Sequence, residues 1–168
     1  MNAPEMTTAG ASPAERDCAF CRVVRGEAAS HIVLADETSL GFLDHRPVFR
    51  GHCLLVPRHH VPTLADLPSA LVGPLFANAQ LLSRAMETGL QAEGSFVAVN
   101  NRISQSVPHL HVHVVPRRRQ DGLRGFFWPR QRYQSDEEMD RIRDLLRAAV
   151  AELLTARKPQ CRSLPAPL

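Results

Sequence analysis

Three histidines at alternate positions are the residues of this chain best suited to chemistry. They lie in the sequence HLHVHVV, residues 109–115, as His109, His111 and His113. Alternation with leucine and valine predicts a β-strand, in which every second side chain points to one face, with neighbours about 7 Å apart. The three imidazoles would share that face. Satisfied or surface histidines are the alternative, but a row of imidazoles makes a poor core because buried polar groups need partners.

Imidazoles arranged in this way suit attack on a phosphoryl centre. Such attack needs a nucleophile that is unprotonated near neutral pH, and the ordinary histidine pKa of about 6.5 provides one. A flanking imidazole can hydrogen-bond a phosphate oxygen or hold the orientation of the nucleophile. His111 is the only histidine of the three that is flanked on both sides, so the geometry favours it as the nucleophile.

The elements that would position these histidines follow from the apolar periodicity. Alternating or β-branched stretches predict strands at 31–37, 40–44, 50–57, 95–100 and 109–116. A stripe at helical spacing, closed by Gly89, predicts a helix through Leu71, Leu75, Ala79, Leu82 and Met86. A capping box of Ser135 and Glu138 opens a second stripe made of Met139, Ile142, Leu146, Ala149 and Leu153. The predicted fold is α+β, with an antiparallel sheet, a long central helix and a C-terminal helix.

Composition bounds the organisation and setting of the chain. Its 168 residues suit one domain, expected over 17–156 between a flexible leader (1–16) and a flexible tail (157–168). The formal net charge of +3 is too small to indicate nucleic acid binding. The chain contains no apolar run of membrane-spanning length and no signal peptide, so no membrane association is expected. Its four cysteines do not form a disulfide framework, which favours a reduced, cytoplasmic location.

Two of these cysteines form a Cys-x-x-Cys motif near the start of the predicted domain. Cys18 and Cys21 lie in the sequence CAFC. A redox pair, two buried thiols and half of a metal site are all compatible with this spacing. A redox pair would normally open a helix in a βαβ unit, which the pattern does not predict. Together with two histidines from elsewhere, the motif would complete a tetrahedral zinc site.

The histidine strand and its surroundings resemble a known family. The sequence QSVPHLHVHVVP (105–116) is similar to the signature of the histidine triad (HIT) family. The resemblance runs from about Cys18 to Arg117 and includes FLDHRPVFRGHCLLVPRHH (42–60). It implies an α+β fold, commonly a homodimer, and a nucleotide hydrolase or nucleotidyl transferase that attacks the α-phosphorus. The implied substrate is a purine nucleotide derivative, either a dinucleoside polyphosphate or a nucleotide phosphoramidate.

The resemblance also implies roles for residues around the triad. His111 would form a nucleotidyl-histidine intermediate that water then cleaves, and His113 would contact phosphate. Ser106 matches the hydroxyl residue before the triad, expected near the α-phosphate and the leaving group, and Gln105 matches a polar position in the same loop. Ordinary turn chemistry is the alternative for Ser106 and Gln105.

Nucleotide contacts carry over from the family with one departure. Asp44 matches the carboxylate that accepts hydrogen bonds from ribose hydroxyls, while Phe42 and Ile32 match residues that line the base pocket. Asn100 or Asn101 matches an amide residue near the ribose and phosphate. The loop NNRISQSV is shorter than the glycine-rich loop of many members and lacks glycine, so the choice between the two asparagines stays open.

Some bacterial HIT proteins resemble this chain in their metal ligands. The matching positions are Cys18, Cys21, His60 and His109, while His52 matches a family histidine near the active site and is a weaker ligand candidate. With all four positions filled by protein, the zinc would be structural, because no position is left for water.

Two features leave the interpretation open. The segment 116–133 holds six arginines against Asp121, and is either a solvated loop or a contact for a polyphosphate leaving group. Trp128 and Pro129 match a segment that, in some members, reaches towards the partner's active site. A zinc-stabilised nucleotide-binding regulatory module with little turnover is the alternative to an enzyme.

Overall fold

The computed structural model describes residues 16–123 together with 134–135, 137 and 140. The chain divides into two compact units, Met1–Leu123 and Arg124–Leu168. The predicted C-terminal helix and tail, nearly all of the leader, and the arginine-rich segment beyond residue 123 therefore lie outside the described residues. All that follows concerns the first unit.

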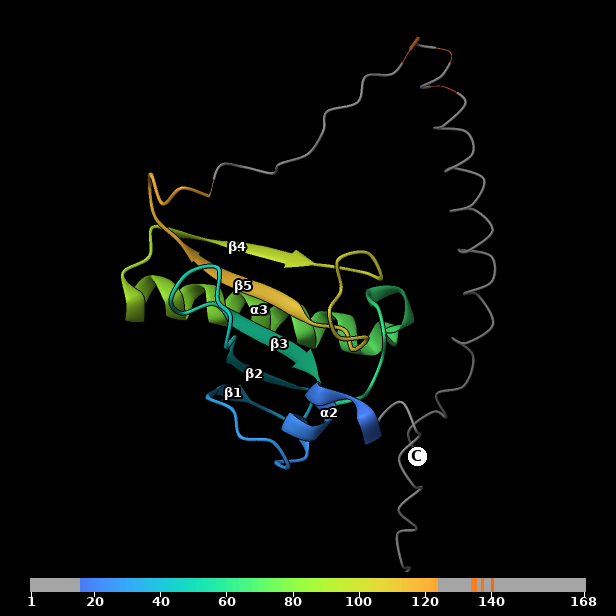
Figure 1. Ribbon diagram of the computed structural model, residues 1–168. Helices are drawn as coiled ribbons and strands as arrows, with labels where there is room; N and C mark the ends of the chain where they lie inside the picture. The colour runs from blue at the N-terminus through green and yellow to red at the C-terminus, as the bar shows by residue number, and fades with distance from the viewer. Residues whose placement is uncertain (1–15, 124–133, 136, 138–139, 141–168) are drawn as a thin grey trace, which may run out of the picture. The chain divides into compact units, whose positions relative to one another are not determined.

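Five strands form a single antiparallel sheet in the described part of the chain (Figure 1). The strands are β1 (Ile32–Ala35), β2 (Ser39–Leu43), β3 (Cys53–Pro57), β4 (Gly94–Val99) and β5 (Val112–Arg117). Their order across the sheet is β1-β2-β3-β5-β4, and each neighbouring pair is antiparallel. β5 therefore lies between β3 and β4, so the strand that carries the last triad histidine is paired on both sides.

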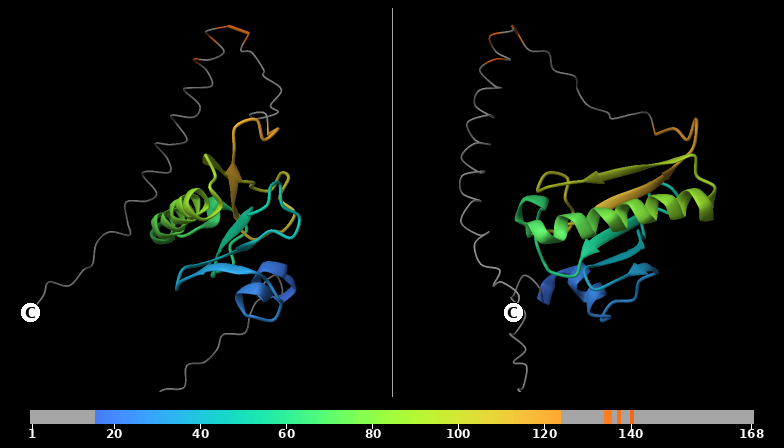
Figure 2. Two further views of the ribbon diagram at one scale, coloured as in Figure 1. Left: turned by 90° about the vertical axis from the view of Figure 1, so that its left-hand side faces the viewer. Right: turned by 180° about the vertical axis from the view of Figure 1, so that it is seen from behind.

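Two α-helices and a short 3₁₀ helix accompany the sheet. They are α2 (Ala19–Val24), η1 (Leu64–Asp66) and α3 (Ser69–Leu90). α3 packs on β3, β4 and β5 and runs across one face of the sheet, as Figure 2 shows from behind. Within residues 16–123, no helix combines the length and the apolarity needed to cross a membrane. The predicted antiparallel α+β fold with a long helix is thus confirmed, apart from its C-terminal helix.

The sheet separates two apolar clusters, because alternate side chains of a strand point to opposite faces. Leu55, with Cys53, belongs to the cluster beneath α3, where Leu75 and Leu82 of the helix are buried. The other cluster contains Leu40, Phe42, Leu54 and Val56, against which Phe20, Val23 and Val24 of α2 pack. α2 therefore covers the face of the sheet opposite α3, and its Phe20 packs against the triad residue His111.

The division of the triad sequence between two faces is confirmed. Leu110, Val112 and Val114 have no exposed surface and lie in the cluster beneath α3. The predicted extent of the strand, 109–116, is wrong at its start, since β5 begins at Val112. The backbone N–H of Leu110 donates to Val61 O at 2.7 Å, and that of His109 donates to Val107 O at 2.8 Å. These bonds lie outside the sheet ladder.

The turn into β3 depends on a glycine. Gly51 has a φ of 97°, a left-handed conformation that costs other residues free energy. A side chain there would also collide with Leu90 at the end of α3. This turn delivers His52 to the edge of β3 in a buried position, with 3% of its surface exposed.

Candidate functional site

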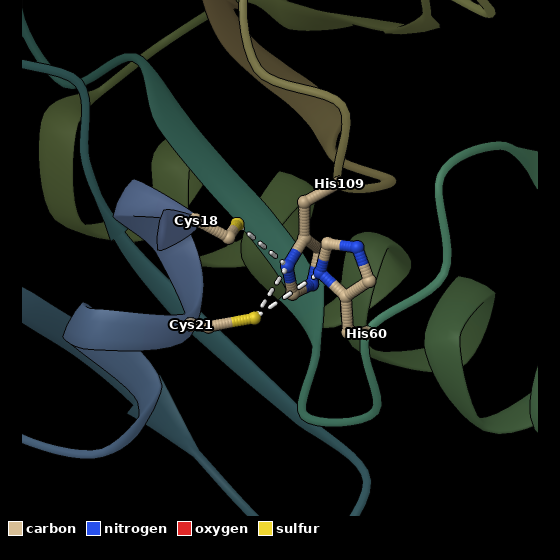
Figure 3. Close-up of side chains that lie close together, drawn as sticks. All are labelled: Cys18, Cys21, His60 and His109. Atoms are coloured by element: carbon tan, nitrogen blue, oxygen red, sulfur yellow. Dashed lines mark hydrogen bonds between the residues drawn. The ribbon is translucent and has the colours of Figure 1, made fainter. Parts of the chain in front are cut away.

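Four side chains from three separate parts of the chain converge beside α2 (Figure 3). Cys18 caps the N-terminus of α2 and Cys21 lies one turn later, so a single short helix presents both thiols. His60 comes from the connection after β3, and His109 lies three residues before the start of β5. The ligand atoms of these four residues all lie within 4.8 Å of one another. They are the four residues that the resemblance implied as metal ligands.

The distances between these side chains suit a tetrahedral metal ion. Cys21 Sγ lies 3.2 Å from His60 Nδ1 and 3.4 Å from His109 Nδ1, and Cys18 Sγ lies 3.5 Å from His109 Nδ1. With metal–sulfur bonds of about 2.3 Å and metal–nitrogen bonds of about 2.0 Å, sulfur and nitrogen ligands of a tetrahedral ion are roughly 3.6 Å apart. The cluster could therefore hold a metal with small adjustments.

The ring of His109 is fixed in the protonation form that a metal ligand needs. Its Nε2–H donates to Pro57 O at 2.9 Å, so the lone pair lies on Nδ1, which faces the two thiols. A ligating histidine typically holds its other nitrogen in this way. Burial, with the neighbouring His60, lowers the pKa of His109 to about 4, so the ring is neutral at pH 7.

The middle histidine is held by the backbone of the first. His111 Nδ1–H donates to His109 O at 2.8 Å, which leaves the ring lone pair on Nε2. The ring is nearly completely buried and packs edge-on between Phe20, with centroids 5.2 Å apart, and His113, with centroids 4.9 Å apart. The structure thus defines one nitrogen of His111 as the acceptor and fixes the plane of its ring.

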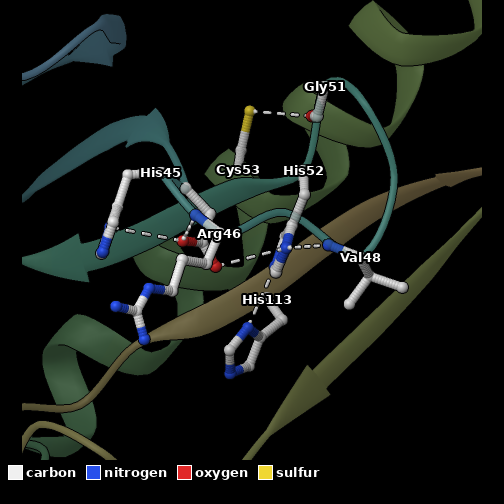
Figure 4. Close-up of polar contacts among 8 residues, drawn as sticks. His45, Arg46, Val48, Gly51, His52, Cys53 and His113 are labelled. Atoms are coloured by element: carbon white, nitrogen blue, oxygen red, sulfur yellow. Dashed lines mark hydrogen bonds and ion pairs between the residues drawn. The ribbon is translucent and has the colours of Figure 1, made fainter.

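The third histidine belongs to a separate group (Figure 4). His113 Nδ1 and His52 Nε2 are 3.0 Å apart, and His52 Nδ1 lies 3.4 Å from Asp44 Oδ2. His113 Nε2 is the one buried side-chain nitrogen or oxygen, among the described residues, that lacks a hydrogen-bond partner. An unsatisfied buried nitrogen next to His111 marks a position where a ligand atom would complete the hydrogen bonding.

Acid should destabilise the protein through His113. Burial, together with His111 and His52, lowers its pKa to about 4, against about 6.5 when unfolded. Between these pH values the unfolded chain binds a proton that the folded chain does not, so the free energy of unfolding falls as pH falls. The free energy of unfolding of the unsubstituted protein should fall between pH 7 and pH 5.5. In His113→Asn we expect this fall, measured by urea denaturation, to be smaller by roughly 1 kcal/mol. The other titrating groups are present in both proteins, so their contributions cancel in the comparison. Equal decreases in the free energy of unfolding of the two proteins would contradict this prediction.

Two polar side chains of the loop before the triad, Gln105 and Asn101, make hydrogen bonds to backbone groups. Gln105 donates from Nε2 to Pro62 O at 2.6 Å and accepts from the backbone N–H of Arg102 at 2.7 Å. Asn101 Oδ1 accepts from the backbone N–H of Leu64 at 2.8 Å. Ser106, one position further along, is exposed. These contacts tie the loop to the segment that follows His60.

The candidate nucleotide-binding residues differ in their surroundings. Asp44 follows β2 directly, is half-buried, and accepts the backbone N–H of Arg46 at 2.9 Å through Oδ1. Ile32 has 48% of its surface exposed, whereas Phe42 has 4% exposed and packs edge-on against Phe20 with centroids 5.6 Å apart. The structure brings Asp44 next to the triad through His52 and places Ile32 opposite Phe42 in the β1–β2 ladder.

The role of Phe20 and the partners of His52 were not predicted from the sequence. Phe20 lies inside the CAFC motif and packs against both His109 and His111, with centroids 6.0 and 5.2 Å away. His52 was considered a weaker metal-ligand candidate, but the structure groups it with Asp44 and His113 instead of with the thiols. The family resemblance had indicated a place for His52 near the active site, and the structure supplies its partners.

Comparison with known proteins decides the family. A family model described as the HIT domain matches residues 25–120, more than half of the chain. The chain belongs to the HIT family. A curated HIT relative, an adenylylsulfatase of Arabidopsis thaliana, is 32% identical over 114 residues. That match covers 67% of this chain but 58% of the relative, so the chain spans less than two thirds of that protein's length.

Other HIT proteins match over a larger share of their length. An adenosine 5'-monophosphoramidase of Saccharomyces cerevisiae is 29% identical over 157 residues, covering 91% of this chain and 95% of the relative. A crystal structure of a zinc-bound histidine triad family protein from Mycobacterium smegmatis is 40% identical, with a TM-score of 0.63, and covers 85% of this chain and 99% of that one. The named activities of the adenylylsulfatase and the phosphoramidase are those of hydrolases. The suspected family and its fold are confirmed.

Proposed function

We propose that this HIT protein is a hydrolase or transferase that attacks the α-phosphorus of a purine nucleotide derivative through Nε2 of His111. One observation carries the proposal. The bond from His111 Nδ1–H to His109 O places the lone pair on Nε2, the atom that must form the bond to phosphorus. The Nε2–phosphorus bond forms as the bond to the leaving group breaks, and water then adds to phosphorus and releases His111.

The neighbours of His111 suit the developing charge on the phosphoryl oxygens. We assign His113 as a phosphate contact, since its buried Nε2 lacks a protein partner among the described residues. A preorganised donor at such an oxygen is worth about 10²–10³ in rate. Ser106, exposed beside the triad, is assigned near the α-phosphate and the leaving group. Gln105 supports this loop through Pro62 O and so contributes to catalysis by positioning.

The nucleoside is assigned to the end of the site formed by Asp44. Its carboxylate is a natural acceptor for two vicinal ribose hydroxyls. The side chain of Asn101 already holds Leu64, which favours Asn100, at the end of β4, as the amide near ribose and phosphate. Exposed Ile32 offers apolar surface for the base. Phe42 supports that surface from its buried position and remains a predicted base-pocket residue.

We propose zinc as the metal of the cluster formed by Cys18, Cys21, His60 and His109. Soft thiolate ligands combined with imidazoles in tetrahedral geometry favour Zn²⁺. Four protein ligands would complete its coordination, so zinc would supply structural cross-linking of α2, the segment after β3 and the start of β5. The zinc-bound relative from Mycobacterium smegmatis supports this choice of metal.

The homodimer and the cytoplasmic location remain predictions. β4 lies at the edge of the sheet, with one side paired to β5. A strand at the edge of a sheet is a position where a second copy of the chain could add by strand pairing. Val97 of β4, with 42% of its surface exposed, adds apolar area at this edge.

A panel of adenylated compounds tests the proposed reaction. Adenosine 5'-phosphoramidate and adenylyl sulfate represent the activities named for the two relatives, and a diadenosine tetraphosphate represents the dinucleoside polyphosphates that the resemblance implies. We expect release of AMP from at least one of them. Rapid acid quenching followed by mass spectrometry should find an adenylyl group on the peptide that contains His111, because the intermediate is covalent. Hydrolysis without any adduct on that peptide would overturn the proposed nucleophile.

The alternative, a regulatory module that binds nucleotide with little turnover, gives a different result in the same experiment. It predicts saturable binding of AMP without turnover of any compound in the panel. The defined lone pair on His111 Nε2 favours the enzyme, because binding alone does not need an oriented nucleophile.

A further inference from the structure

A chain of hydrogen-bonding groups connects the proposed ribose site to the proposed phosphate site. Asp44 Oδ2 lies 3.4 Å from His52 Nδ1, and His52 Nε2 lies 3.0 Å from His113 Nδ1. A second group competes with Asp44 for His52 Nδ1, since the backbone N–H of Val48 lies 3.3 Å from this nitrogen and can donate to it when it carries a lone pair (Figure 4). His113 Nε2, at the far end, has no partner among the described residues.

The two rings share a single proton between them. Burial lowers the pKa of His52, and it lowers the pKa of His113 to about 4, so both rings are neutral near pH 7. A neutral imidazole has one N–H and one lone pair. The 3.0 Å contact between the rings therefore holds one N–H, which either His52 or His113 supplies.

Only two arrangements of protons satisfy this contact. In the first, His52 Nδ1–H faces the Asp44 carboxylate and His113 Nδ1–H donates to His52 Nε2, which leaves a lone pair on His113 Nε2. In the second, Val48 N–H donates to His52 Nδ1 and His52 Nε2–H donates to His113 Nδ1, which puts a proton on His113 Nε2. Both rings carry the same tautomer in each arrangement, and they must switch together.

Only the second arrangement suits a phosphate. A phosphoryl oxygen is an acceptor, so it needs an N–H on His113 Nε2 and is repelled by a lone pair there. Without a ligand, Asp44 Oδ2 and Val48 N lie at similar distances from His52 Nδ1, 3.4 and 3.3 Å, and the negative charge of the carboxylate favours a proton on this nitrogen, which is the first arrangement. A ribose diol that donates two O–H groups to the same carboxylate competes with His52 Nδ1–H and releases it to accept from Val48.

We propose that ribose binding at Asp44 switches His52 and His113 together to their Nε2–H tautomers, which makes His113 a donor to the phosphate. This inference rests on the proposed function and adds substrate-dependent control to the same site. His52 is then a positioning residue, and the ribose hydroxyls determine specificity in the chemical step as well as in binding.

Nitrogen-15 NMR of the histidine side chains tests the switch without turnover, because the two neutral tautomers have different ring nitrogen shifts. The probes are AMP and 2',3'-dideoxy-AMP, each added to saturation at pH 7.5. We expect AMP to move both His52 and His113 from Nδ1–H to Nε2–H, and the dideoxy compound to cause a clearly smaller shift. Equal effects of the two probes, or opposite tautomers on the two rings, would overturn the proposal.

Kinetics provide the second measurement, using whichever adenylated compound is turned over and its 2',3'-dideoxy counterpart. We expect kcat to fall by at least about tenfold without the hydroxyls, since a donor to the phosphoryl oxygens is lost. The ratio of kcat with the ribose hydroxyls to kcat without them should approach one in His52→Phe. His52→Gln, which keeps a side-chain N–H, should restore part of this ratio. Unchanged ratios in both variants would contradict the role of His52.

A matched control separates this inference from the proposed function. His45→Asn alters a largely exposed histidine beside Asp44 and should leave the ratio as in the unsubstituted protein. If AMP binds and adenylated compounds are hydrolysed but the tautomers do not respond, the switch alone is wrong. If AMP does not bind at all, the proposed function fails and the switch fails with it.

Discussion

Replacing His111 with asparagine is expected to lower turnover by several orders of magnitude while the fold is kept. Asparagine can still donate towards His109 O, which holds the native ring at 2.8 Å, but it offers no nitrogen lone pair to attack phosphorus. Steady-state and single-turnover rates with the best adenylated compound measure the loss. A thermal unfolding curve close to that of the unsubstituted protein would show that the effect is chemical.

A control and a contrary outcome make the His111 experiment decisive. His59→Asn changes an exposed histidine of the same region and should keep the full rate. AMP should still bind to His111→Asn, because Asp44 and His113 are untouched. Retention of most of the hydrolytic rate in this variant would show that another residue, or water itself, attacks the phosphorus.

The paired substitution Cys18→Ser and Cys21→Ser is expected to remove zinc and lower the melting temperature. Metal affinity contributes to folding stability when the ligands come from separate parts of the chain, as here. A loss of about 3 kcal/mol would lower the melting temperature by roughly 6–12 °C in a chain of this size. Metal analysis should find about one zinc per chain before the substitution and none after it.

Cys53 supplies the control for the zinc experiment. Cys53→Ser alters a buried free cysteine in the cluster beneath α3 and should keep the full zinc content. Turnover of the double variant should fall less than in His111→Asn, because the metal orders the scaffold without touching substrate. Protein purified without metal, together with an unchanged melting temperature in the double variant, would leave the CAFC motif as two buried thiols. Abolished chemistry in a folded, zinc-free protein would instead indicate a catalytic metal.

The alternating pattern predicted the two faces of the triad segment because side-chain periodicity is a local property. Leu110, Val112 and Val114 lie beneath α3 as expected. The residue at which β5 starts could not be predicted from the local pattern, because it depends on backbone groups that are distant in the sequence. Leu110 N–H bonds to Val61 O, nearly fifty residues earlier in the chain, so the segment leaves the ladder before the strand begins at Val112.

The candidate site shows the same limit in its side chains. Local spacing indicated Cys18 and Cys21 as a pair of ligands, but it did not indicate the short helix that presents them. Nothing local shows that Asn101 is engaged by Leu64, so sequence alone left it equivalent to Asn100. The grouping of His52 with His113 likewise arises from the register that pairs Leu54 with His113. Long-range pairing decides each of these points.

The anchoring of His109 has a consequence for how the chain finds one folded arrangement. A segment with histidines at every second position is nearly identical to itself after a shift of two residues, since the apolar side chains would again face α3. Such a shifted strand would bury almost the same surface and would be hard to reject on hydrophobic grounds. The His109 ring removes this ambiguity, because its two nitrogens must meet Pro57 O and the thiols of α2 at once. A shift of two residues in one direction would place Val107 against Pro57 O and the thiols, and a shift in the other direction would place Val115 beside His52, which now lies 3.0 Å from His113. The contact of His109 with Pro57 O and the thiols of α2 therefore also helps to set the register of β5, and with it which of three chemically equal imidazoles occupies the reactive position.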